Sequence, residues 1–163
     1  MHNYLGRHRY ADAVAVKWLD PDEMAAWRLY IETSGDLLRA IERDLEPFGL
    51  DRGDYQLLAM LSEAPGGKLR LCDLADTLRL TRSGLTRRME GVVRKKLVVR
   101  EQSTQDRRVA HARLTPKGLA LLKKAAPHHL RSVRRLMIDH LSATEIRAIA
   151  SAFEKIAANL AAD

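Results

Sequence analysis

The sequence that decides the fold is LCDLADTLRLTRSGLTRRMEGVVRKKLVVRE, residues 71–101, together with DRRVAHARLTPKG, residues 106–118. Residues 72–78 are long enough for two helical turns, and Cys72 occupies the expected cap position. After a tight turn, Thr81 is a good cap for a second helix. Apolar residues then recur at helical spacing, which predicts a buried face on this second helix. They are Leu85, Met89, Val92 and Val93.

The second helix is followed by a pattern that predicts a β-hairpin. Residues 97–102 and 109–114 read as strands, and the segment STQDRR, residues 103–108, joins them. Thr115 and Pro116 then start another helix, because threonine is a preferred cap and proline suits the first helical position. A helix, a turn, a helix and a two-stranded hairpin together make a winged helix-turn-helix. In that unit the second helix enters the DNA major groove, which is wide enough to admit it.

Long helices with apolar stripes flank this central unit. The first helix begins after the expected cap Asp20, and its apolar residues step by three and four positions as far as residue 45. A capping box of Ser142 and Glu145 opens the last helix, which repeats the same spacing. Both helices are therefore expected to bury one face.

The helix that starts at Pro116 is expected to run to about residue 139 and to bury a similar stripe. Its predicted buried residues are Leu119, Leu122, Ala126, Leu130, Val133 and Met137. The stripes on the outer helices are too extensive for the central unit to cover, which favours a symmetric homodimer. The alternative is that the two end regions pack only on each other within one chain.

The predicted fold is mainly α-helical with a small antiparallel β-wing. We expect a winged helix-turn-helix DNA-binding region at residues 51–115. A dimerisation helix at 20–50 precedes it, and C-terminal dimerisation helices at 116–163 follow it. Residues 1–19 have no clear periodicity and are expected to form an N-terminal arm.

Composition narrows the class of protein. The 163 residues suit one domain, and an apolar share of 46% is enough to build a core. The net charge of +7 indicates an anionic partner, most often nucleic acid or a membrane surface. No apolar run reaches the length of a membrane span or a signal-peptide core, so we expect a cytoplasmic protein without membrane attachment. A single cysteine excludes an internal disulfide.

No enzyme motif is recognisable. The sequence lacks a glycine-rich phosphate loop, a Ser/His/Asp set in a nucleophile context and a carboxylate pair in a recognisable cleft. The six histidines do not show a two-ligand spacing on one helix face. We therefore expect a protein that is not an enzyme and that holds no cofactor and no metal.

Two groups of residues are candidates for contacting double-stranded DNA. On the second helix, arginine can bond guanine bidentately and hydroxyls can bond phosphates or base edges. These recognition-helix candidates are Thr81, Arg82, Ser83, Thr86 and Arg87. At the hairpin tip, an arginine can enter a minor groove, and Asp106 is expected to aim it. Whether Arg107 or Arg108 does so is left open by these residues.

Residues 51–122 resemble the MarR family of winged-helix regulators. The resemblance rests on the two segments quoted first, and on a wing pattern of Asp-x-Arg, a spacer and Leu-Thr-x-x-Gly. The matching residues are Asp106, Arg108, Leu114, Thr115 and Gly118. Two positions depart from the family: Lys96 stands where a glycine is usual, and Cys72 stands where the first helix-turn-helix helix usually has a Ser or Thr cap.

The resemblance implies a homodimer that binds a pseudo-palindromic operator and usually represses nearby genes. It also implies release of DNA by a small, often aromatic ligand, and it favours Arg108 as the wing residue in the minor groove. The candidate ligand pocket comprises Trp27, Tyr30, His111 and His129. The alternatives are a regulator that responds to oxidation of Cys72, and a winged-helix interaction module that does not read DNA.

Overall fold

The computed structural model describes residues 17–103, 106 and 109–162. Arg107, Arg108 and most of the predicted N-terminal arm lie outside the described residues. The chain divides into two compact parts, one up to Asp36 and one from Leu37. In the part of the chain that is described, no helix is both long and apolar enough to cross a membrane.

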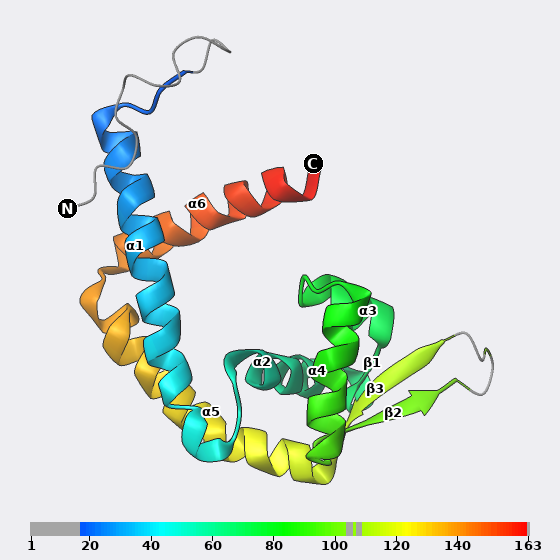
Figure 1. Cartoon of the computed structure of the whole chain (residues 1–163). Helices are drawn as coiled ribbons and strands as arrows, with labels where there is room; N and C mark the ends of the chain where they lie inside the picture. Colours follow the sequence, from blue (N-terminus) through cyan, green and yellow to red (C-terminus); the bar gives the residue numbers. More distant parts are fainter. Residues whose placement is uncertain (1–16, 104–105, 107–108, 163) are drawn as a thin grey trace. The chain divides into compact units, whose positions relative to one another are not determined.

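The structure is mainly helical with one small sheet, as the sequence predicts (Figure 1). The α-helices are α1 (Pro21–Arg43), α2 (Arg52–Glu63), α3 (Leu71–Thr77), α4 (Arg82–Arg94), α5 (Pro116–Leu136) and α6 (Ala143–Ala162). The strands are β1 (Lys68–Arg70), β2 (Val98–Gln102) and β3 (Ala110–Leu114). Short 3-10 helices lie at Glu46–Phe48, Pro65–Gly67 and Ile138–His140.

The three strands form an antiparallel sheet in the order β1-β3-β2. Lys68 pairs with Arg113, and Val98 pairs with Leu114. Glu101 on β2 joins all three strands, since it accepts a hydrogen bond from Arg113 Nε at 2.5 Å and contacts Lys68 Nζ at 3.2 Å. Hydrogen bonds from Arg113 and Lys68 hold the pKa of the Glu101 carboxyl below its usual value.

One hydrophobic core holds the winged helix-turn-helix together. The largest fully buried side chains come from the residues after α1, from α2, α3 and α4, from the turn after α4 and from the start of β2. They are Leu45, Leu57, Leu58, Leu61, Leu74, Val92, Leu97 and Val98. Burying these side chains fixes the helices and the sheet as one unit.

The predicted Asp20 cap of the first helix and the predicted capping box of the last helix are confirmed, and the first helix also proves to have a capping box. Asp20 Oδ1 accepts the amides of Asp22 and Glu23, and the amide of Asp20 donates to Glu23 at 2.9 Å. Ser142 and Glu145 bond each other in the same reciprocal way before α6. These contacts satisfy amides that a helix start leaves without partners.

The prediction that Cys72 caps a helix is wrong. Helix α3 begins at Leu71, with Arg70 as the cap residue and no side-chain cap bond, so Cys72 lies inside the first turn. Strand β1 ends at Arg70 and leads directly into the helix, which leaves no room for a separate cap. The Cys72 thiol is exposed and donates to Asp73 Oδ1 at 3.2 Å.

The predicted buried stripe of α5 is displaced by about one residue. The residues of α5 buried within the chain are Gly118, Leu122, Ala125 and Ser132. Of the predicted stripe, Leu122 is buried, but Leu119 and Leu130 are exposed. The helix also ends at Leu136 rather than near residue 139. Apolar residues recur at helical spacing on two neighbouring faces of α5, so the spacing alone does not identify which face is buried.

The backbone conformation at Lys96 accounts for the glycine that is usual at this position. Its φ of 60° is left-handed, a conformation that disfavours residues with a Cβ. The amides of Lys96 and Leu97 donate to the carbonyls of Val93 and Val92 and so close the end of α4. The turn into β2 therefore keeps its geometry, and lysine bears a conformational cost.

Replacing Lys96 with glycine is expected to stabilise the protein. Left-handed backbone costs an ordinary residue roughly 1–2 kcal/mol, and glycine avoids this cost. Glycine also loses more conformational entropy on folding, which offsets roughly 0.5–1 kcal/mol of the gain. The free energy of unfolding in urea should therefore rise by about 0.5–1 kcal/mol. Lys96→Ala keeps the left-handed strain and should give no gain; an equal gain in both variants would contradict this account.

Gly118 lets α5 approach the end of α4. The Thr115 hydroxyl lies 2.9 Å from the carbonyl oxygen of Lys96 and 3.0 Å from that of Leu97. Thr115 Oγ1 also accepts a hydrogen bond from the Gly118 amide. A Cβ built on Gly118 would lie 2.2 Å from the Leu97 carbonyl oxygen. This contact is the physical reason for the glycine in the Leu-Thr-x-x-Gly pattern.

Gly118→Ala is expected to lower the free energy of unfolding by about 1–3 kcal/mol, because the backbone must move apart. Gly91 in α4 is the matched control, since a Cβ there would meet nothing within 4 Å. Gly91→Ala should instead raise stability by roughly 0.5–1 kcal/mol through helix propensity. Thermal or urea unfolding measures both, and a neutral Gly118→Ala would show that the junction is not tightly packed.

Candidate nucleic-acid interface

Helix α4 is held in one orientation by its cap and its buried face. Thr81 Oγ1 accepts the Gly84 amide at 3.1 Å, as the sequence predicts. Leu85, Met89 and Val92 are buried in the core, whereas the predicted core residue Val93 is exposed. Because one face is buried, the residues on the opposite face must point away from the core.

The five residues predicted to contact DNA from α4 lie together around its N-terminal half. Thr81, Arg82, Ser83, Thr86 and Arg87 are all exposed. The hydroxyls of Thr81 and Ser83 lie 3.1 Å apart, and Thr86 Oγ1 donates to the carbonyl oxygen of Arg82. Each hydroxyl oxygen keeps a lone pair, and the arginines present donors, so this surface can bond phosphates and base edges.

A groove lies between α4 and the sheet, with arginines around it. Arg82 and Thr86 line it from α4, Arg100 lines it from β2, and Arg70 lines it from the end of β1. Sequence reasoning missed Arg70 and Arg100 as candidate phosphate contacts. Arg100 is exposed between the partly buried Val99 and Glu101, so the strand period of two was the available signal.

The wing is described up to its tip. The amide of Ser103 donates to the carbonyl oxygen of Val109 at 2.9 Å, which continues the pairing of β2 and β3. The amide of Val109 donates to the carbonyl oxygen of Asp106, so Asp106 lies in the turn. Because Arg107 and Arg108 lie outside the described residues, the pairing of Asp106 with an arginine stays a prediction.

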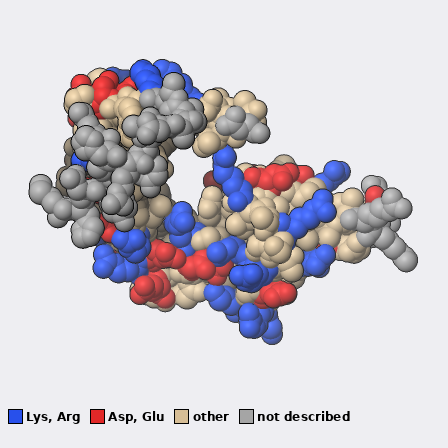
Figure 2. Space-filling model, turned by 45° about the horizontal axis from the view of Figure 1, so that its top comes forward, with Lys and Arg blue, Asp and Glu red and all other residues tan. Residues whose placement is uncertain are grey.

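Charge alone does not mark the interface. Figure 2 shows Lys and Arg side chains over the visible face with Asp and Glu side chains between them. The exposed arginines of α4 are also mixed with negative charge, because Glu90 lies among them and is exposed. The candidate interface is therefore identified by the direction in which α4 presents its side chains.

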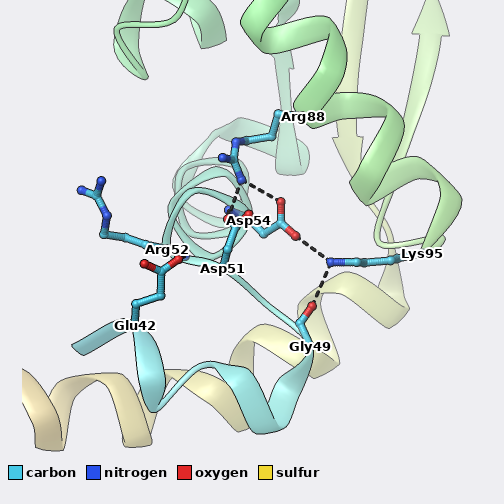
Figure 3. Close-up of polar contacts among 7 residues, drawn as sticks. All are labelled: Glu42, Gly49, Asp51, Arg52, Asp54, Arg88 and Lys95. Atoms are coloured by element: carbon cyan, nitrogen blue, oxygen red, sulfur yellow. Dashed lines mark hydrogen bonds and ion pairs between the residues drawn. The ribbon is translucent and has the colours of Figure 1, made fainter. Parts of the chain in front are cut away.

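A polar network joins the side of α4 to the start of α2 (Figure 3). Arg88 Nη1 lies 2.5 Å from Asp51 Oδ1 and 2.9 Å from Asp54 Oδ1. Lys95 Nζ contacts Asp54 Oδ2 and the Gly49 carbonyl oxygen, each at 2.8 Å. Burial would raise the pKa of Asp51, but hydrogen bonds from the Asp54 amide and Arg88 outweigh it and hold this pKa below its usual value.

The predicted ligand-pocket residues fall in separate parts of the chain. Trp27 and Tyr30 contact each other on α1, with ring centroids 6.3 Å apart. His129 on α5 packs on the ring of Tyr55 at 4.3 Å, and burial lowers the pKa of His129. His111 lies on β3, where it pairs with Arg70 and Glu101. A single pocket formed by all four residues therefore stays a prediction.

Three comparisons connect this geometry to known proteins. The model of the MarR family matches residues 48–109. AbsC, a MarR family transcriptional regulator from Streptomyces coelicolor, is 38% identical, and the match covers 91% of this chain and 100% of AbsC with a TM-score of 0.87. Sco3205, a MarR family regulator from the same organism solved in complex with DNA, is 31% identical, with coverage of 89% and 92% and a TM-score of 0.86.

The HTH-type transcriptional repressor YetL of Bacillus subtilis is 28% identical over 92 residues. These residues make up 56% of this chain and span 55% of YetL. The likeness to AbsC, in contrast, extends over nearly the whole of both chains and includes the outer helices. On this evidence, and with the winged helix-turn-helix described above, the chain belongs to the MarR family of transcriptional regulators.

Proposed function

We propose that this protein binds a pseudo-palindromic operator as a homodimer and represses nearby genes until a small organic ligand releases it. The observation that carries the DNA-binding part is the orientation of α4. Its apolar face is locked in the core, Ser83 and Arg87 lie on the opposite face, and Arg82 and Thr86 flank it, all four exposed to solvent. A helix presented in this way suits the major groove. The wing, with Arg107 or Arg108, is proposed to enter the adjacent minor groove.

Apolar side chains exposed on the outer helices support the homodimer. In the single chain, α6 has no buried residue within its described length, and Phe153, Ile156 and Leu160 are about half exposed. Leu119 and Leu130 on α5 and Ile31 on α1 are also exposed. Large apolar surfaces of this kind usually mark a protein–protein interface. Two-fold pairing would bury them and place two α4 helices for two half-sites.

The repressor part rests on the printed role of a relative, and the ligand part rests on aromatic side chains. YetL is described as a repressor, and we extend that role to this chain as a proposal. An aromatic ligand would suit the rings of Trp27, Tyr30 and His129, each of which already packs on another ring. The alternative sensor, Cys72, is exposed, so Cys72→Ser tested with peroxide distinguishes oxidation from ligand release.

The DNA-binding proposal is tested with the protein's own upstream region. Wild type should bind one fragment of this region in preference to scrambled DNA, with an affinity that falls steeply as salt rises. Arg87→Ala should reduce this preference by about 5- to 150-fold, the equivalent of losing one good arginine–guanine contact. A mobility-shift titration at several salt concentrations measures both quantities.

Arg147→Ala is the matched control, because Arg147 is also an exposed helical arginine and lies on α6, outside the proposed DNA interface. It should leave the preference unchanged. Wild-type protein that binds every fragment equally, or not at all, would contradict DNA readout and would favour an interaction module. Light scattering on the same samples should give the mass of two chains.

A further inference from the structure

Arg87 and Arg88 are neighbours in the sequence but lie in different environments. They are about 100° apart around the helix. Arg87 is exposed on the side of α4 that faces solvent. The Arg88 side chain is only 26% exposed and reaches across to the start of α2, where it meets two carboxylates (Figure 3). Two identical side chains therefore offer two different functions on one helix.

The start of α2 forms a cradle that fits the Arg88 guanidinium. Asp51 and Asp54 provide carboxylate oxygens to its Nη1 atom. Gly53 lies between them, and a Cβ built there would be 2.3 Å from Arg88 Cζ. Any other residue at this position would push the guanidinium away. The absence of a side chain at Gly53 and the two carboxylates beside it thus act together on one group.

Asp54 makes the connection specific, because its side chain is only 7% exposed and both of its oxygens are bonded to cations. Oδ1 contacts Arg88, and Oδ2 contacts Lys95. Arg88 and Lys95 are seven residues apart, which is about two turns or 10 Å along a helix. Two attachments at this separation fix both the rotation and the tilt of α4. A buried carboxylate also strongly disfavours losing either partner.

We propose that Arg88 is a positioning residue for DNA recognition: it makes no contact with DNA and, with Lys95, fixes the rotation of α4 against Asp54. This inference rests on the proposed DNA-binding function and deepens it. Base-edge hydrogen bonds require donor and acceptor placement within a few tenths of an ångström. A rotation of α4 therefore weakens all base contacts together, whereas loss of one reading side chain affects one base pair.

The experiment compares Arg87→Met with Arg88→Met on the operator fragment and on a set of single base-pair substitutions across one half-site. Arg87→Met should abolish the penalty at one position. Arg88→Met should reduce the penalties at every position and lower operator affinity by about tenfold. The slope of affinity against salt should stay within less than one unit of wild type, since no phosphate contact is lost.

Asp54→Asn provides a second route that keeps both cations and the side-chain shape. It should reproduce the pattern of Arg88→Met, and the double variant should be no worse than either single one, because both remove the same constraint. Arg88→Lys should recover part of the loss, since lysine keeps the charge but lacks the planar fork. Thermal unfolding identifies any variant that fails to fold, and Asp54→Asn then carries the comparison with Arg87→Met.

Several results would overturn the inference. Loss of preference at a single position in Arg88→Met would make Arg88 a base-reading residue. A salt slope lower by about one unit with unchanged preference would make it a phosphate contact. Lower thermal stability with unchanged preference would leave it a purely structural residue. Wild-type protein without any sequence preference would instead contradict the proposed function, a distinct outcome.

Discussion

The buried carboxylate of Asp54 sets the constraint on which the DNA-binding unit depends. A charge removed from water is tolerated only beside compensating charges and donors. Arg88 on α4 and Lys95, the cap residue directly after α4, provide them, so α4 must lie against the start of α2 in one way. At the end of α1, Glu42 accepts the Arg52 amide at 3.1 Å, which joins the same start of α2 to that helix (Figure 3).

The interior and the polar network divide the task of holding α4. Leu85, Met89 and Val92 are buried and determine which face of the helix turns inward. Apolar contact has little directional preference, so it tolerates small rotations. Hydrogen-bonded ion pairs are directional, so they do not tolerate such rotations. The network therefore supplies the angular precision that base readout requires and that the core alone does not provide.

A second junction holds the wing and α5. Thr115 and Gly118 bring the start of α5 against the carbonyl groups of Lys96 and Leu97, while Glu101 ties the three strands together. The left-handed turn at Lys96 lies between these contacts. The end of α4, the wing and the start of α5 thus meet within a few residues, so their relative directions are set locally.

The sequence by itself determined the winged helix-turn-helix, the caps at Asp20, Thr81, Thr115 and Ser142, and the exposed residues of α4, because periodicity and capping depend on local geometry. It did not determine which of two apolar faces of α5 is buried, where α3 begins, or that Arg88 turns to α2 while Arg87 does not. These features depend on partners more than thirty residues away in the chain or on strand pairing. Only the tertiary structure brings those partners together and so decides between side chains that look alike in sequence.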